Sequence, residues 1–295
     1  MSKQHRNTIF VEEAHILAHE SLDGGQQVLR LDAPKLAAHA LPGSFAHIQC
    51  DAELAMRRPM SVMRVDAKAG WAEFLYKTVG KGTRLLAQKR AGDSVSVLGP
   101  IGQGFAADPA RPRALLIGGG VGIPPMVFLA DQLRKTRSYQ PFVLMGSEVP
   151  FPFPVRPSQI MLPGMPDGTI ACMPLMEDWG IASRLASQQG YAGCHDGYVT
   201  DLARAWLDAL DDAGRQQVAI YTCGPTPMLK AVAELANTYE LPCQVCLEEF
   251  MACAVGGCAG CAVRVHDGDQ EAMKRVCVDG PVFAAQNVMW DAIPH

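Results

Sequence analysis

Four cysteines near the C-terminal end of the chain have a spacing that suits metal chemistry. Cys253, Cys258 and Cys261 follow the pattern C-x4-C-x2-C, and Cys277 comes after a longer gap. Four thiolates with this plant-type spacing bind a 2Fe-2S cluster. The residues between the first three are mostly alanine and glycine, so the backbone can curl closely and point N–H groups at sulfur. The pattern therefore predicts a 2Fe-2S site.

A four-cysteine zinc site is the alternative. Structural zinc sites usually pair their cysteines as two CxxC units. Among these four cysteines, only Cys258 and Cys261 have that spacing. We therefore favour the iron-sulfur cluster, and the zinc site stays open.

The composition is that of a globular protein with more than one module. The chain has 295 residues, of which 48% are hydrophobic and 19% charged, and this length predicts two or three modules. The net charge of −4 and the lack of a basic stripe argue against nucleic acid as a partner.

The ten cysteines raise the question of the compartment. The first residues, MSKQHRNTIF, lack the apolar core of a signal peptide, and a chain of this size does not need disulfides to fold. The most apolar run, 114–130, is broken by glycines and two prolines, so no membrane-spanning helix is expected. We expect a cytoplasmic protein with no membrane contact of its own.

Short strands are expected between residue 8 and about residue 98. The segments 27–31, 45–50 and 71–79 are apolar or alternating runs between turn signals. Strands at this spacing indicate an antiparallel sandwich or barrel.

Two motifs in this region could bind a phosphate-bearing cofactor. Arg58-Pro59-Met60-Ser61 combines a guanidinium suited to phosphate with a serine hydroxyl. The segment 75–83, LYKTVGKGT, ends in a glycine-rich turn whose N–H groups could bind a pyrophosphate. Each also fits an ordinary strand start or hairpin, so neither decides the function alone.

The pattern changes after a proline-containing linker at 105–113, and we place a domain boundary near Ala110. A buried strand at 113–117 leads into a glycine turn, 118–122, and then an amphipathic helix over 126–137. A helix that starts with prolines after such a turn can hold a phosphate at its N-terminus. The glycines do not fit G-x-G-x-x-G, so a dinucleotide site and a purely structural turn both stay open.

Alternating strands and helices follow, which indicates a parallel sheet. We expect strands at 142–146, 170–175 and 218–223, and helices at 199–210 and 226–236. Six prolines between 150 and 166 exclude a regular helix, so this crossover is expected to be irregular.

Three further cysteines lie on the expected strands. Cys223 ends the strand 218–223, at the edge where open α/β sheets bind ligands. No histidine adjoins it in sequence, so we favour a small residue lining a ligand site over a nucleophile. Cys243 and Cys246 lie three apart on the last strand, 241–248, where they point to opposite faces and are expected to be core thiols.

The order of the motifs is more specific than any one of them. RPMS, YKTVGKGT, GPIGQGF, GGGVGIPP, CGPTPM, LEEFMACAVGGCAGCAV and VCVDGPVF together resemble the electron-transfer subunits of class 1B dihydroorotate dehydrogenases, in the ferredoxin-reductase superfamily. The resemblance covers roughly residues 8–283. It implies a mixed β and α/β fold: an FAD-binding antiparallel β-barrel at 1–110, a nicotinamide-binding α/β domain with a parallel sheet at 111–242, and a small 2Fe-2S domain at 243–295.

The resemblance also implies which residues bind each cofactor, and it implies no catalytic acid or base. FAD would be held by Arg58, Pro59, Met60, Ser61, Leu75, Tyr76, Lys77, Gly82 and Thr83. NAD would be received by Gly118, Gly119, Gly120, Val121, Gly122, Cys223, Gly224, Pro225 and Met228. The 2Fe-2S cluster would be held by Cys253, Cys258, Cys261 and Cys277.

The function that the resemblance implies is an electron relay in pyrimidine biosynthesis. An FMN-containing dihydroorotate dehydrogenase catalytic subunit oxidises dihydroorotate to orotate, and electrons pass through 2Fe-2S and FAD to NAD+. The flavin is required because nicotinamide exchanges two electrons together and the cluster exchanges one at a time. Such a relay needs a heteromeric complex, expected as a heterotetramer.

The cluster loop departs from the usual family pattern, C-G-x-G-x-C. Here Ala254 follows Cys253, and the glycines are Gly256 and Gly257. Alanine does not readily adopt a positive φ, so we expect a loop path peculiar to this chain.

Two other functions stay open on the sequence. The same parts would serve an NAD(P)H-dependent reductase subunit for a ferredoxin, hydrogenase or sulfur-reducing partner, because the partner chooses the substrate. A zinc-stabilised binding module without redox activity is the alternative of another class.

Overall fold

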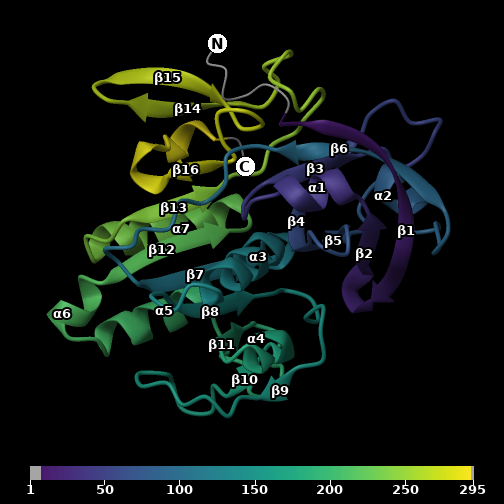
Figure 1. Cartoon of the computed structure of the whole chain (residues 1–295). Helices are drawn as coiled ribbons and strands as arrows, with labels where there is room; N and C mark the ends of the chain where they lie inside the picture. The colour runs from purple at the N-terminus through teal and green to yellow at the C-terminus, as the bar shows by residue number, and fades with distance from the viewer. Residues whose placement is uncertain (1–7, 294–295) are drawn as a thin grey trace.

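Residues 8–293 are described by the computed structural model. Residues 1–7, part of the segment inspected for a signal peptide, and residues 294–295 lie outside the described residues. Figure 1 shows a barrel beside an open sheet, with a smaller C-terminal lobe above one end of that sheet.

The N-terminal part is a closed barrel with the strand order β1-β2-β5-β4-β3-β6, and neighbouring strands are antiparallel. Its strands are β1 (Phe10–Leu22), β2 (Gln26–Asp32), β3 (Phe45–Ile48), β4 (Arg58–Asp66), β5 (Trp71–Lys77) and β6 (Ser94–Ile101). Two short helices accompany them, α1 (Pro34–His39) and α2 (Lys81–Leu86). Alternate residues such as Leu29, Leu31 and Phe74 are fully buried inside, as the period of two in a strand requires. The predicted antiparallel barrel is confirmed.

The second part is a six-stranded sheet with the order β11-β8-β7-β12-β13-β16. Neighbours from β11 to β13 are parallel, and β16 is antiparallel to β13. The strands are β7 (Arg113–Gly119), β8 (Gln140–Gly146), β11 (Ala182–Ala186), β12 (Val218–Cys223), β13 (Cys243–Cys246) and β16 (Val282–Ala284). The predicted parallel sheet is confirmed, and the carboxyl ends of its parallel strands form one edge.

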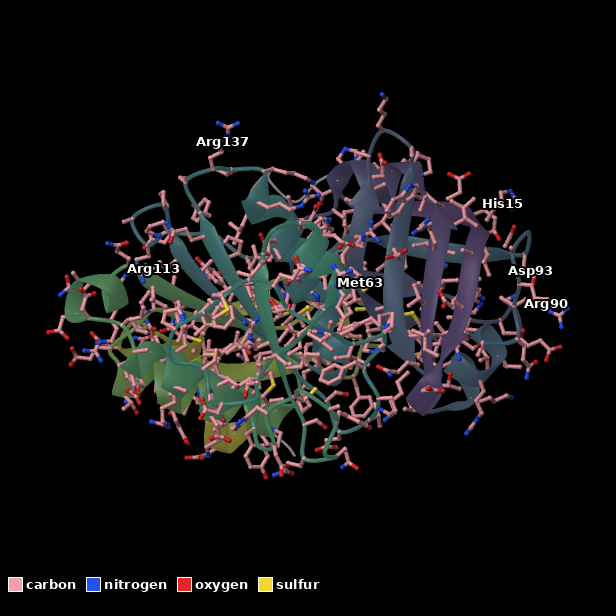
Figure 2. The ribbon with its side chains drawn as sticks, turned by 90° about the horizontal axis from the view of Figure 1, so that it is seen from below. His15, Met63, Arg90, Asp93, Arg113 and Arg137 are labelled. Atoms are coloured by element: carbon pink, nitrogen blue, oxygen red, sulfur yellow. The ribbon has the colours of Figure 1, made fainter. Side chains whose placement is uncertain are left out.

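The helices of this part are α3 (Ile123–Arg134), α4 (Pro174–Asp178), α5 (Val199–Asp208), α6 (Asp212–Arg215) and α7 (Thr226–Thr238). Helix α3 is buried without a break from Ile123 to Asp131, so the predicted amphipathic pattern is wrong. The reason is its place: α3 packs on the sheet on one side and on β4 of the barrel on the other. Met63 of β4 lies at this junction between the two parts (Figure 2).

The strand predicted at 170–175 is mostly wrong. Only β10 (Ala171–Cys172) forms there, paired with β9 (Arg156–Pro157) in a separate two-stranded sheet, and α4 begins at Pro174. Proline has no N–H to donate to a ladder but fits the first turn of a helix. The neighbour of β8 in the main sheet is β11, which the sequence reading did not predict.

The C-terminal lobe carries the hairpin β14 (Ala262–Asp267) and β15 (Gln270–Arg275). It is inserted between β13 and β16, two neighbouring strands of the main sheet. The boundary expected between 242 and 243 falls just before β13. The division into three domains stays a prediction, and the mixed β and α/β fold class is confirmed.

Candidate functional site

The four predicted cluster cysteines lie together in the C-terminal lobe. Cys253, Cys258 and Cys261 lie in the loop between β13 and β14, and Cys277 lies just after β15. Cys258 is exposed and Cys253 half-buried, whereas Cys261 and Cys277 are buried. The backbone N–H of Cys258 donates to Cys253 Sγ at 3.4 Å, and that of Gly260 donates to Cys258 Sγ at 3.5 Å. Such inward N–H groups stabilise thiolate ligands.

The thiols come together as two pairs. Burial and a hydrogen bond with Cys261 raise the pKa of Cys277 to about 12. Burial opposes ionisation of Cys253, but N–H donors from Val255 and Cys258 and a contact with the Cys258 thiol lower its pKa to about 7. Within the part of the chain that the structure describes, no three His, Cys, Asp or Glu side chains converge as a metal site requires, so the four cysteines lie as two pairs and not as one closed ligand set. Two pairs of thiols are the donor set of a two-iron cluster, which takes two thiolates per iron.

The loop keeps the left-handed backbone that this curl requires. Ala254 and Ala259 both have φ of 54°, and Gly256 has φ of 79°. Alanine at 254 therefore adopts the conformation that glycine favours, contrary to the expectation from the family pattern. Arg275 ties the loop to the Cys277 turn, because it donates to the carbonyl of Gly256 at 3.0 Å and to Asp279 at 3.0 Å.

The predicted flavin residues of β4 lie at one end of the barrel. The guanidinium of Arg58 packs against Gly82, where a Cβ would approach Arg58 Nε to 3.0 Å. Glycine at 82 therefore permits Arg58 to approach the start of α2. Pro59, Met60 and Ser61 follow along the strand, and Met60 is buried.

The segment after β5 forms a tight turn. Thr83 Oγ1 accepts hydrogen bonds from the N–H groups of Val79 and Gly80 at 3.0 and 3.1 Å. The hydroxyl of Thr78, which the sequence reading did not single out, is buried there and has no partner within the described residues. An unsatisfied buried hydroxyl beside a cationic turn suits a phosphate-bearing ligand.

The three residues 75–77 are divided between core and surface. Leu75 and Tyr76 are buried, and Lys77 is exposed. The hydroxyl of Tyr76 lies 2.9 Å from His19 Nε2. A ligand outside the barrel would therefore contact this segment through its backbone and through the side chain of Lys77.

The two predicted nicotinamide motifs meet at the carboxyl edge of the sheet. Cys223 is the register partner of Gly118 on the neighbouring strand. A Cβ at Gly119 would approach Met228 Sδ to 2.5 Å, and one at Gly122 would approach the carbonyl of Cys223 to 2.2 Å. Two turns this close need glycine, which explains why the run 118–122 is glycine-rich without following G-x-G-x-x-G.

Cys223 has an unexpected neighbour. Cys246 is its register partner on β13, and both thiols are buried. A hydrogen bond with Cys246, followed by burial, raises the pKa of Cys223 well above its usual value. A protonated thiol is a poor nucleophile, so this geometry favours a residue that lines a ligand site.

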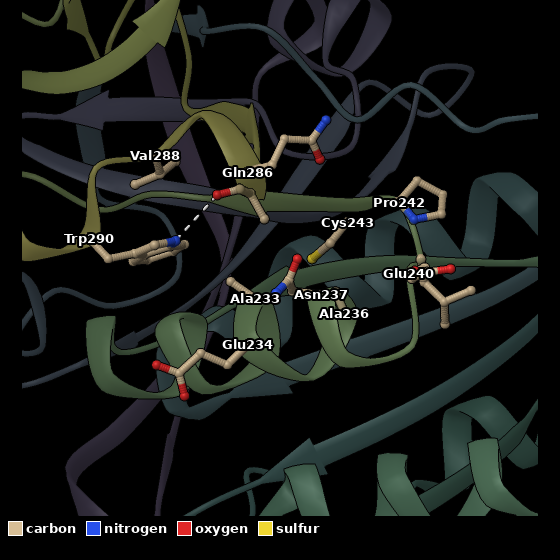
Figure 3. A pocket seen from close by; sticks show the side chains of 12 residues that line it. Ala233, Glu234, Ala236, Asn237, Glu240, Pro242, Cys243, Gln286, Val288 and Trp290 are labelled. Carbon is tan, nitrogen blue, oxygen red and sulfur yellow. Dashed lines mark hydrogen bonds between the residues drawn. The ribbon is translucent and has the colours of Figure 1, made fainter. Parts of the chain in front are cut away.

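A surface groove of about 670 Å³ lies elsewhere, between α7 and the residues 285–290. Figure 3 shows Trp290, Glu234 and Cys243 around this groove, and the indole N–H of Trp290 donates to the carbonyl of Ala285 at 3.2 Å. It lies where β13 begins, at the opposite edge of the sheet from the glycine turns. Separately, none of the helices within residues 8–293 has the length and apolar character needed to span a membrane.

The fold defines the class of protein. The chain resembles the NADH-dependent reduced ferredoxin-NADP oxidoreductase of a study of flavin-based electron bifurcation, with a TM-score of 0.76 and 24% identity over 95% of this chain and 91% of that chain. It also resembles the ferredoxin reductase of carbazole 1,9a-dioxygenase, with a TM-score of 0.61 and 21% identity over 79% of this chain and 67% of that one. The fold is that of the ferredoxin reductases.

Sequence comparison narrows the class to one family. Residues 248–289 match the family described as the iron-sulfur cluster binding domain of dihydroorotate dehydrogenase B. The dihydroorotate dehydrogenase B (NAD(+)) electron transfer subunit of Bacillus caldolyticus is 38% identical over 254 residues, 84% of this chain and 86% of that protein. The same subunit of Desulforamulus reducens is 30% identical over 283 residues, 95% of this chain and 99% of that protein. The chain belongs to the family of dihydroorotate dehydrogenase B electron transfer subunits, and the predicted resemblance is confirmed.

Proposed function

We propose that this chain relays electrons, released when a partner chain oxidises dihydroorotate to orotate, to NAD+. One observation carries the proposal. The segment matched to the iron-sulfur family holds four thiols in two pairs, and it is inserted at the sheet that carries the two glycine-rich turns. In this proposal a one-electron site would lie beside a candidate dinucleotide site, because the lobe is attached to the same sheet.

Cys253, Cys258, Cys261 and Cys277 would hold a 2Fe-2S cluster, which exchanges one electron at a time. The N–H groups of Cys258 and Gly260 direct positive dipoles at the sulfurs. Arg275 fixes the loop through Gly256. The chain's own contribution is to orient these ligands and to set how strongly they hold charge.

The end of the barrel would hold FAD, which exchanges electrons both singly and in pairs. Arg58 supplies positive charge suited to a pyrophosphate, and the hydroxyl of Thr78, which has no partner within the described residues, is a polar group that such a ligand would satisfy. The residues proposed for this role are Arg58, Pro59, Met60, Ser61, Leu75, Tyr76, Lys77, Gly82 and Thr83.

The carboxyl edge of the sheet would receive NAD+. The glycine turn at 118–122 lets the ligand approach the backbone, and Cys223 offers a small, uncharged thiol beside it. The residues proposed for this role are Gly118, Gly119, Gly120, Val121, Gly122, Cys223, Gly224, Pro225 and Met228.

The partner in this proposal is an FMN-containing catalytic chain, and the assembly is a heterotetramer in the cytoplasm. The exposed side of Cys258 supports contact with another protein at the cluster loop. All ten cysteines lie within the described residues and are free thiols, which supports a reducing compartment.

The test is reconstitution. The complete chain, loaded with flavin and iron, is mixed with a dihydroorotate-oxidising FMN chain from the same genome, and orotate and NADH are followed together. We expect equal amounts of orotate and NADH. When this chain is omitted from the mixture, we expect no NADH and no stable complex. A complex that makes orotate without NADH formation would contradict the proposed relay.

The metal content gives an independent check. Aerobically purified protein should show the absorption of an iron-sulfur cluster and a flavin, with iron and no stoichiometric zinc. A colourless protein containing one zinc per chain would instead establish the zinc-stabilised binding module.

A further inference from the structure

The two pairs of cluster cysteines stand on separate supports. Cys261 and Cys277 lie at the open end of the β14–β15 hairpin, where the N–H of Val276 donates to the carbonyl of Cys261 at 2.9 Å. Cys253 and Cys258 lie on the preceding loop, whose own N–H groups donate to their sulfurs. One two-iron cluster takes two thiolates on each iron, so it requires the loop and the hairpin to be held together.

Arg275 connects the loop to the hairpin. It is the last residue of β15, and its Nη1 donates to the carbonyl of Gly256 at 3.0 Å. Gly256 lies between Cys253 and Cys258 in the sequence. The loop that carries one pair is therefore attached to the strand that leads to Cys277.

Asp279 holds the other side of the same guanidinium. Its carboxylate accepts from Arg275 Nε at 3.0 Å and from Nη2 at 3.2 Å, and the backbone N–H of Arg275 also donates to it, at 2.8 Å. The N–H of Asp279 returns a hydrogen bond to the carbonyl of Arg275 at 2.8 Å. The planar fork of an arginine makes all these contacts at once, which a lysine cannot do.

Gly256 fits against the Cys277 turn with no room for a side chain. It has φ of 79°, and a Cβ there would approach Val278 Cγ2 to 2.9 Å and Arg275 Nη1 to 3.2 Å. At the next residue, Gly257, the nearest atom to a Cβ would be Cys253 Sγ, at 4.0 Å. The close approach of the loop to this turn is therefore made at Gly256.

Both ends of this connection act on the second pair of thiols. Burial and a hydrogen bond with Cys261 raise the pKa of Cys277, and the N–H of Gly256 opposes this rise. Hydrogen bonding to Asp279 raises the pKa of Arg275, and the charges of Cys277 and Cys261 raise it further. Hydrogen bonds to sulfur and positive charge nearby stabilise the extra electron of a reduced cluster, and so they raise its reduction potential.

Building on the proposed function, we propose that Arg275 is a positioning residue of the cluster: by holding the carbonyl of Gly256 it keeps the loop against Cys277 and thereby sets the reduction potential of the cluster. Asp279 shares the charge of Arg275. The fixed position of Gly256 therefore contributes more to the potential than the charge alone.

The test is a redox titration of the complete chain, loaded with flavin and iron, in which the EPR signal of the reduced cluster reports its midpoint potential. In Arg275→Leu, reduction should become about tenfold less favourable, which is a fall of about 59 mV for one electron. Arg275→Lys keeps the charge but loses the fork, so its potential should fall by a similar amount. Arg264→Leu is the control: this half-exposed arginine of β14 faces Glu271 at 3.8 Å, and its loss should leave the potential unchanged.

Two glycine variants test the same contact from the side of the loop. Gly256→Ala should lower the potential, because the added Cβ displaces the loop from Val278 and Arg275. Gly257→Ala has room for its Cβ and should keep the wild-type potential. Equal potentials in the two variants would contradict a role for this contact.

Each outcome decides one question, and iron is measured in every variant. A wild-type potential in either Arg275 variant overturns the positioning role and leaves the proposed relay standing. Failure of both Arg275 variants to take up iron, while Arg264→Leu does so, shows a purely structural role and also overturns it. A wild-type chain without the EPR signal of a reduced iron-sulfur cluster removes the cluster from the proposed function, and the role of Arg275 falls with it.

Discussion

Cys258 is the exposed member of the four thiols, so its replacement removes a proposed ligand without disturbing the core. In Cys258→Ser we expect the iron-sulfur absorption to be lost and the flavin to be retained, because the barrel is a separate part of the fold. Iron content and visible absorption measure this. Cys194→Ser is the control, since Cys194 lies outside the loop, and it should keep its iron. Full iron content in Cys258→Ser would remove this residue from the ligand set.

His47 predicts a dependence of stability on pH. It is 1% exposed on β3, its Nε2 has no partner within the described residues, and burial followed by the charges of Arg57 and Arg58 lowers its pKa from 6.5 to about 4. Between these values the unfolded chain binds more protons than the folded one, so stability should fall as the pH drops through this window. The loss is about 3.5 kcal/mol at most, at about 1.4 kcal/mol per pKa unit.

Urea unfolding between pH 4 and 7 measures this effect. His47→Leu should flatten the pH dependence, while His266→Leu, an exposed histidine on β14, should not. An unchanged pH profile in His47→Leu would contradict the assignment.

Single residues were predictable where their chemistry is local. The spacing of Cys253, Cys258 and Cys261 predicts a shared ligand role within nine residues of sequence, and that role stays a prediction. The contact between the β1–β2 hairpin and the loop after β8 was not predictable, because it depends on a hydrogen bond between Gln26 and Pro150, 124 residues apart. The orientation of Tyr76 likewise depends on His19, on a different strand of the barrel.

The cluster loop carries strain that glycine would relieve. Ala259 is exposed and has φ of 54°. Ala259→Gly should therefore stabilise the folded loop by up to about 1 kcal/mol, because the left-handed conformation costs an L residue about that much. Slower loss of iron absorbance in a chelator would show it. Ala252→Gly, also exposed but without a positive φ, should show no gain, and equal gains in both variants would contradict the explanation by strain.

Trp179, directly after helix α4, contacts both the barrel and helix α3 of the second part. The ring of Trp179 lies 5.9 Å from the guanidinium of Arg64 on β4 and 4.4 Å from that of Arg134 on α3. Trp179→Leu should lower the free energy of unfolding by about 1–2 kcal/mol, the sum expected for two cation–π contacts.

Differential scanning calorimetry measures the effect of Trp179→Leu. Tyr198→Leu, a ring with 64% of its surface exposed, is the control and should cost much less. Equal losses of unfolding free energy in Trp179→Leu and Tyr198→Leu would contradict a stabilising role for the two cation–π contacts of Trp179.

Elements were predictable where one pattern decided them. The alternating apolar and polar residues of β2 predicted this strand correctly, and the glycine run before α3 predicted a turn followed by a helix correctly. The segment 170–175 failed because apolar content alone does not distinguish a strand from a short helix, and Pro174 decided for the helix. Helix α3 failed in another way: one side was expected to meet water over the whole length, but α3 packs against β4 of the barrel as well as on the sheet, and only the tertiary packing reveals that.

At the scale of the whole molecule, the insertion of the lobe predicts what iron removal does. Strands β13 and β16 pair with each other in the main sheet, outside the segment that carries the four cysteines. Chelation should therefore abolish the iron absorption while far-UV circular dichroism and bound flavin stay nearly unchanged. Unfolding of the sheet or release of the flavin on chelation would show instead that the cluster holds the fold together.

Cys246, where the chain leaves the sheet for the lobe, and Val282, where it returns, are register partners. The segment 247–281 thus leaves the main sheet and re-enters it at adjacent positions on two paired strands, so it forms a single inserted unit. The two connections between the lobe and the sheet therefore lie side by side. Electron exchange with a partner therefore depends on how the partner approaches the lobe. If the segment 247–281 were replaced by that of a related chain, we expect the hybrid protein to dock with the partner of that related chain.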